Sequence, residues 1–297
     1  MMKLRLFLRS SAKNALNSLI LIILLLFSGC SSSLTPTYLK ENIDKAIQDI
    51  CKAEYNLDVK VKLVGSTLWI YLPLEDIFEK SEKPEKYFEK FSLEQIRNIP
   101  SDASLKFAYL IRAVPEKEKT QEYKYKKDTI EKINNVWKVL RRVIFSLDRS
   151  KETEPTFYYL ITADIKNGLE MKELFYSLDL KKVSYEYISW EEYQHRTIQD
   201  TDFGAQIIAD TEGMHIHYRD ITMKEFITEQ IIHRIRLKFQ KPEVDKNVDI
   251  DREIIKVIAA TVKIYDFKEF NFVELNNLEN NNKLLLSRPS LLDTFNH

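Results

Sequence analysis

Glycine is scarce in this 297-residue chain, with five in total, and their positions exclude several catalytic motifs. No two glycines have the spacing of GxGxxG, GxxxxGK[ST] or GxSxG. The sequence therefore lacks the dinucleotide-binding loop, the phosphate-binding loop and the nucleophile elbow of many hydrolases. Cysteine is scarcer still, with two residues. Neither sign of charge is in excess, since the chain has 45 basic and 45 acidic residues.

The composition that remains is typical of a folded globular protein. Hydrophobic residues make up 44% of the chain and charged residues 30%. These values exclude a disordered or fibrous protein. The charged residues form no long basic stripe, so we expect no nucleic-acid partner.

The first 29 residues have the pattern of a signal peptide. Lys3, Arg5, Arg9 and Lys13 precede an apolar run over 15–27, and no acidic residue accompanies them. Thirteen helical residues span about 20 Å, which is short of the roughly 30 Å hydrocarbon core of a bilayer. A positively charged segment followed by a short apolar run indicates a secretory signal rather than a permanent membrane span.

Ser28, Gly29 and Cys30 end this segment, and three serines follow them. Here the chain resembles the precursors of bacterial lipoproteins, whose signal peptide ends in a lipobox before a lipidated cysteine. The resemblance implies cleavage before Cys30, a diacylglyceryl thioether on its sulfur and an acyl group on the new amine. It also implies that Ser31 favours the outer membrane if the organism has one. The alternatives are an ordinary cleaved signal peptide and an uncleaved anchor.

Removal of residues 1–29 changes the charge and the thiol content of the protein. The mature chain would carry 41 basic and 45 acidic residues, a net charge of −4. With Cys30 lipidated, Cys51 is the only thiol left, so an intrachain disulfide cannot form. Cys51 lies on the apolar stripe of a predicted helix, and we expect it to be buried and inert.

We predict an α+β fold, made of two-layer helix-on-sheet subdomains with an N-terminal αββ hairpin unit. In that unit a helix over 38–55 precedes alternating strands over 57–63 and 67–72. Gly65-Ser66 between the strands is typical of a type II′ turn. The predicted division is a signal peptide (1–29), a lipidated tether (30–36), an N-terminal subdomain (37–166) and a C-terminal subdomain (167–297).

Periodicity and capping signals predict the remaining elements. The helices are expected at 85–91, 128–147, 171–178, 189–195, from 222 and at 249–265. The strands are expected at 106–114, 156–165, 183–187, 205–209, 214–218, 267–275 and 283–286. Residues 116–127 carry many charges without an apolar stripe, and we expect a solvated connector there.

His215 and His217 are the candidate metal ligands. In the predicted strand over 214–218 they would share one face, and Glu212 or Asp220 could add a carboxylate. Two imidazoles and a carboxylate are typical zinc ligands, and this arrangement would suit an envelope hydrolase. The alternative is an exposed polar face, because Arg219 would lie on the same side and would repel a cation.

An aromatic cluster lies at Tyr185, Tyr187, Trp190 and Tyr193. Exposed, it could stack on the sugars of a cell wall; because Tyr185 and Tyr187 share a face with Val183, we expect core packing instead.

The sequence leads us to expect a lipid-anchored protein of the cell envelope with a non-enzymatic interaction or scaffold role and no cofactor. Its expected partners are the membrane, through the lipid anchor, and an envelope protein or the cell wall. The alternatives are a metal-dependent hydrolase at His215 and His217 and a glycan-binding lipoprotein.

Overall fold

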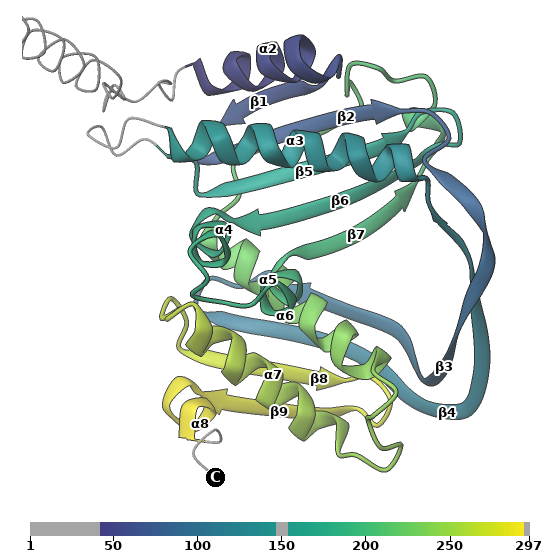
Figure 1. The fold of residues 1–297 in the computed structure, drawn as a ribbon. Helices are drawn as coiled ribbons and strands as arrows, with labels where there is room; N and C mark the ends of the chain where they lie inside the picture. Colours follow the sequence, from purple (N-terminus) through teal and green to yellow (C-terminus); the bar gives the residue numbers. More distant parts are fainter. Residues whose placement is uncertain (1–41, 147–153, 294–297) are drawn as a thin grey trace, which may run out of the picture.

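The computed structural model describes residues 42–146 and 154–293, in which helices pack against two mixed β-sheets (Figure 1). This arrangement confirms the predicted α+β class. The predicted signal peptide, Cys30 and the tether lie outside these residues.

The first sheet has five strands in the order β1-β2-β5-β6-β7. The pair β2 and β5 is parallel, and every other neighbouring pair is antiparallel. The strands are β1 (Lys60–Val64), β2 (Thr67–Leu74), β5 (Phe157–Asp164), β6 (Leu169–Tyr176) and β7 (Ile198–Phe203).

The second sheet has four strands in the order β3-β4-β8-β9. Its central pair, β4 and β8, is parallel, and the outer pairs are antiparallel. The strands are β3 (Phe78–Ile99), β4 (Ser104–Tyr125), β8 (Phe272–Asn277) and β9 (Asn282–Ser287).

Seven α-helices and a 3-10 turn complete the part of the chain that the structure describes. They are α2 (Ile43–Tyr55), α3 (Lys127–Phe145), α4 (Ser177–Ser184), α5 (Trp190–Arg196), the turn Ala205–Ile207, α6 (Met223–Gln240), α7 (Ile250–Ile264) and α8 (Arg288–Asp293). Within residues 42–146 and 154–293, none of the helices has the length and apolar character needed to cross a bilayer.

The predicted αββ unit is present as α2, β1 and β2. Val64 pairs with Thr67 across the two-residue loop, and Gly65 has φ of 59°, the left-handed region that a type II′ turn requires at its first loop position. The helix α2 buries Ile43, Ile47 and Cys51 against the sheet, as its apolar stripe predicts. Burial raises the pKa of the Cys51 thiol to about 12, which keeps it protonated.

The two faces of the first sheet belong to different hydrophobic cores. Helices α2 and α3 cover one face, where Leu68, Ile70 and Leu160 pack against them. On the other face, Tyr71 and Ile161 belong to a larger core that also contains side chains of α6, α7 and the second sheet. One continuous core therefore joins the two sheets.

The strands do not follow the predicted division at 166/167. β5 ends at Asp164 and pairs along its whole length with β6, which begins at Leu169. The second sheet likewise pairs β4, from the first half of the chain, with β8, from the second half. Each sheet therefore contains strands from both of the predicted subdomains.

Five local predictions are wrong. Residues 85–91 and 116–125 are strand rather than helix and connector, and 171–178 is mainly strand β6 rather than helix. Residues 183–187 are the end of α4 and the turn after it, and the predicted hairpin over 205–218 is a 3-10 turn followed by irregular chain. The first three of these segments are held in strands by pairs distant in sequence, which periodicity does not report.

Candidate functional sites

An irregular segment over 208–221 carries His215 and packs on the larger-core face of the first sheet. Ile221 is buried there, and Trp69 of β2 donates its indole N–H to the carbonyl of Arg219 at 2.8 Å. The hydroxyl of Tyr71, also on β2, donates to the carbonyl of Asp210 at 2.6 Å. The segment therefore covers part of this face without forming a helix.

The imidazole of His215 lies between two carboxylates. Its Nδ1 is 2.5 Å from Oδ2 of Asp210, and its Nε2 is 2.8 Å from Oε2 of Glu170 on β6. The Glu170 side chain is 5% exposed, and its other oxygen forms an ion pair with Lys172 at 2.7 Å. The backbone amide of His215 also donates to Asp210, at 3.1 Å. The three side chains form a nearly buried ionic cluster.

This geometry favours the protonated form of the imidazole. An ionised carboxylate only accepts hydrogen bonds, so a ring nitrogen that faces one must carry a proton to form the bond. Burial alone would lower the pKa of His215, but the bonds to Asp210 and Glu170 outweigh it and raise the pKa above its ordinary value. Burial would raise the pKa of Asp210, yet its bonds from the ring and from loop amides lower it to about 2.

An imidazolium with both nitrogens occupied has no lone pair for a metal ion or for proton abstraction. His217 lies on exposed, irregular chain rather than on the same strand face as His215. Of the residues that the structure describes, no three His, Cys, Asp or Glu side chains are arranged to hold a metal ion. The geometry gives no support to the predicted metal site. The cluster of Asp210, His215 and Glu170 instead attaches the segment over 208–221 to β6.

Sequence reasoning found His215 but missed both of its partners. Glu170 is 45 residues away, and Asp210 directly follows the strand that we predicted over 205–209. A charged residue in a strand gives no signal that distinguishes a buried partner from an exposed one. Glu212 and Asp220, the carboxylates we predicted, instead pair with Lys60 and with the hydroxyls of Ser66 and Thr67.

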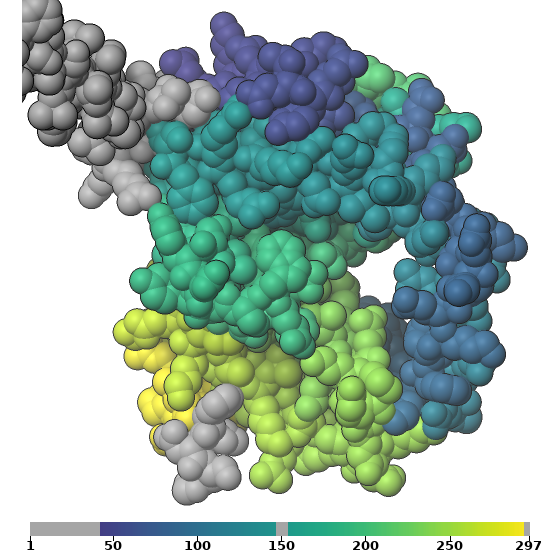
Figure 2. Space-filling view, in the orientation of Figure 1, coloured from purple at the N-terminus to yellow at the C-terminus, as the bar shows by residue number. Residues whose placement is uncertain are grey.

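A second candidate site is the long two-stranded ribbon between the sheets. We define the arm as Phe78–Lys90 of β3 with Ala113–Tyr125 of β4. Every residue of the arm is exposed or half-buried. The arm runs along one side of the molecule from the first sheet to the second, and Figure 2 shows open space between it and the body.

Cross-strand pairs hold the arm together without a core. Lys86 pairs with Glu118 at 2.7 Å and Lys119 with Glu89 at 2.7 Å. Such opposite-charge pairs stabilise a strand pair only modestly. Its root is fixed by Asp164, whose carboxylate accepts the amide of Ile77 at 3.0 Å.

The edges of the arm are protected against pairing with another strand. The register of β3 shifts between Lys80 and Glu85 and again between Glu89 and Phe91, and Pro84 and Pro115 each remove an amide donor. Bulges, prolines and lysines are devices that prevent edge-to-edge association. The exposed aromatic residues Tyr87, Phe88 and Tyr123 are therefore available on the faces of the ribbon.

The aromatic cluster after α4 is a third candidate, and its expected core packing is wrong for three of the four residues. Tyr185, Tyr187 and Trp190 are 57%, 81% and 59% exposed, whereas Tyr193 is buried. The reason is that α4 ends at Ser184, so the two tyrosines lie on a turn instead of one strand face.

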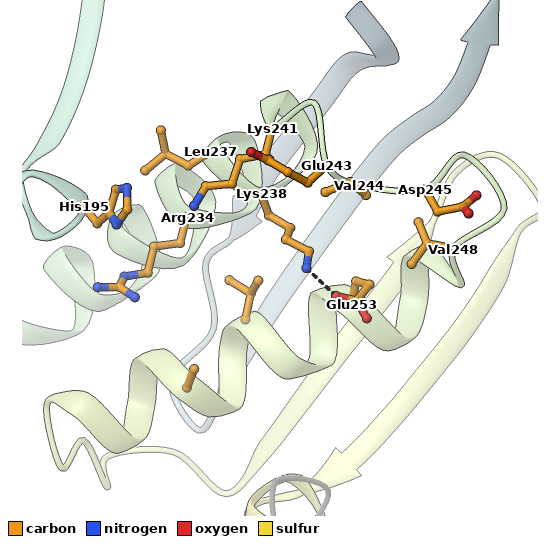
Figure 3. A pocket seen from close by; sticks show the side chains of 12 residues that line it. His195, Arg234, Leu237, Lys238, Lys241, Glu243, Val244, Asp245, Val248 and Glu253 are labelled. Carbon is orange, nitrogen blue, oxygen red and sulfur yellow. Dashed lines mark ion pairs between the residues drawn. The ribbon is translucent and has the colours of Figure 1, made fainter. Parts of the chain in front are cut away.

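A fourth candidate is a cleft between α6 and α7, with a volume of about 470 Å³ (Figure 3). Leu237, Val248 and Val257 give it an apolar floor. Lys238 on α6 and Glu253 on α7 form an ion pair across it at 2.8 Å. Basic and acidic side chains line the cleft in equal number, Arg234, Lys238 and Lys241 against Glu243, Asp245 and Glu253, so its walls select no ligand of one sign.

Comparison with protein-family models, curated proteins and solved structures finds no match to this chain.

Proposed function

We propose that this protein is a lipid-anchored component of the cell envelope that binds another envelope protein through the arm. The observation that carries the proposal is the arm itself, two long strands kept in solvent with aromatic side chains on both faces. Exposed aromatic side chains among charges are typical of protein interfaces. The lipobox pattern at Ser28, Gly29 and Cys30 supports the anchor, with the outer membrane as its place if the organism has one.

The anchor is tested by substitution of Cys30. In a host with lipoprotein processing, Cys30→Ser should block maturation or release the protein from the membrane fraction, because a lipid chain contributes most of the membrane affinity. Unchanged processing and unchanged membrane association of the variant would contradict the anchor.

The interaction role is tested by a photo-crosslinking amino acid at Tyr87 or Tyr123 of the full chain in cells. We expect discrete crosslinked products from these positions. The matched control is Met214, which is 85% exposed on the segment that carries His215. The proposal fails if Met214 gives the same products, or if the purified protein shows a catalytic activity that one substitution abolishes.

A further inference from the structure

The turn after α4 and the first residue of α5 present three large aromatic side chains to solvent. We call Tyr185, Tyr187 and Trp190 the aromatic patch. A contiguous patch of exposed apolar side chains on a folded protein often marks an interaction surface. Tyrosine and tryptophan combine an apolar ring with a polar group, and they are enriched where a membrane meets water.

The backbone holds this patch in a fixed arrangement. The amide of Tyr187 donates to the carbonyl of Lys182 at 2.8 Å, and Glu186 between the tyrosines has φ of 61°. This is the pattern that ends a helix with a left-handed residue, a position that usually carries glycine. The ring of Tyr185 also packs edge-on against Phe145 in the last turn of α3, with 5.7 Å between centroids.

Cations lie next to the patch. Phe145 shares a shallow hollow with Lys138, Arg141 and Arg142 at the end of α3. All three cations are exposed, and Arg142 also forms a bidentate pair with Glu54 of α2, so Lys138 and Arg141 are the cations of this hollow outside that pair. Two exposed acidic residues lie nearby, Glu186 on the turn and Glu191 in α5. Lysine and arginine close to a bilayer are attracted by anionic lipids.

The position of the patch matches the position of the proposed anchor. The start of α2, the end of α3 and α4 lie at one end of the molecule, and the arm lies at the other (Figure 1). Cys30 is 12 residues before Asn42, a distance of at most about 40 Å in extended chain. A tethered surface needs little affinity of its own, because the tether keeps its local concentration high.

We infer that the aromatic patch, with Lys138 and Arg141, rests on the interface of an anionic lipid bilayer and orients the arm away from it. This inference rests on the proposed lipid anchor at Cys30. The anchor supplies attachment, and the patch supplies orientation.

The test uses the lipidated full-length protein, purified from membranes and reconstituted in vesicles of phosphatidylglycerol and phosphatidylcholine with brominated acyl chains. Bromine quenches tryptophan that lies at the bilayer. Among the described residues Trp190 is exposed, whereas Trp69 is buried and Trp137 half-buried. We expect quenching that disappears in Trp190→Phe and persists in the matched control Trp137→Phe.

A double variant, Lys138→Gln with Arg141→Gln, tests the electrostatic part. In anionic vesicles it should reduce the ratio of docked to undocked protein by about five-fold for each cation removed, with no such change in vesicles of phosphatidylcholine alone. Vesicle flotation, measured on the same samples, reports the anchor separately.

The outcomes distinguish the two proposals. Protein that floats with the vesicles but shows no quenching, or equal quenching in Trp190→Phe, overturns the docking inference and leaves the anchor standing. Protein that does not float overturns both. If Trp190 emission instead responds to insoluble peptidoglycan and not to brominated lipid, the patch contacts glycan and the docking inference is wrong.

Discussion

His215 and His233 are both nearly buried, but their surroundings drive their charges in opposite directions. The ring of His215 lies between Asp210 and Glu170, which raises its pKa. His233 lies on α6, where burial, reinforced by the positive charges of Arg234 and Arg236, lowers its pKa to about 4. Burial lowers the pKa of both rings, and in His215 the two carboxylate partners outweigh it.

The difference matches how the two regions are held in place. The segment over 208–221 has no regular secondary structure and is fixed to the sheet by polar contacts that include the nearly buried His215 cluster. Helix α6 begins with a full capping box at Thr222 and Glu225 and buries Phe226, Ile231 and Ile235. The first region therefore depends on charge pairing and the second on apolar packing.

Substitution His215→Ala should break this comparison most severely. It leaves Glu170 and Asp210 without their shared cation, and the loss of one partner from a buried ionic group typically costs about 3–5 kcal/mol. We expect urea unfolding at pH 6 to show a loss of this size. His217→Ala is the matched control, because His217 is exposed on the same segment. A similar loss in both variants would contradict the role of the His215 cluster in attaching this segment to the sheet.

Substitution His233→Leu should remove an acid sensitivity rather than stability at neutral pH. His233 is neutral when folded, so its contribution is present above about pH 6.5 and is lost as the pH falls towards 4. The two proteins should differ by less than about 1.5 kcal/mol at pH 7, since Leu is apolar and of similar size.

At pH 4 the Leu variant should be relatively more stable by about 3 kcal/mol, the equivalent of the shift in pKa. Urea titrations of both proteins from pH 7 to pH 4 measure the difference. Parallel pH profiles would show that His233 is not kept neutral by its surroundings.

The same contrast explains which parts of the fold were predictable. The αββ unit and α3 follow from apolar periodicity, because each buries one regular face. The arm has no such face, and its strands pair through charged side chains such as Lys86 and Glu118. A charge-rich sequence with two prolines therefore indicates a connector. The two strands nevertheless form a β-ribbon, because β3 and β4 pair with each other along the arm.

The candidate sites were predictable to the same limited degree. His215 was identified by its residue type, but its charge depends on Glu170, which the pairing of β5 with β6 brings to the same place. Exposure of Tyr187 depends on where α4 ends, which is one residue before Tyr185. Both facts require knowledge of contacts that local sequence patterns do not contain.

The pH profile of the wild-type protein should sharpen the comparison from the alkaline side. The pKa of His215 is raised on folding, so its contribution is fully present below about pH 6.5 and is lost as the pH rises through the folded pKa. The free energy of unfolding should therefore decrease above pH 6.5 in the wild type but not in His215→Ala. Urea midpoints measured from pH 6 to pH 9 give both slopes, and equal slopes would mean that His215 does not titrate differently on folding.

The smallest effect is expected in the arm, where charge pairs are exposed. Lys119→Gln removes the ion pair with Glu89, and both side chains are more than 30% exposed. Water screens such pairs, and their removal typically costs about 0.2–1 kcal/mol. Urea unfolding in low salt should show a loss in this range that shrinks at 1 M salt, while the loss in His215→Ala persists, because salt screens exposed charges far more than buried ones. A loss in Lys119→Gln as large as that in His215→Ala would mean that the arm, like the segment over 208–221, depends on charge pairing for its place in the fold.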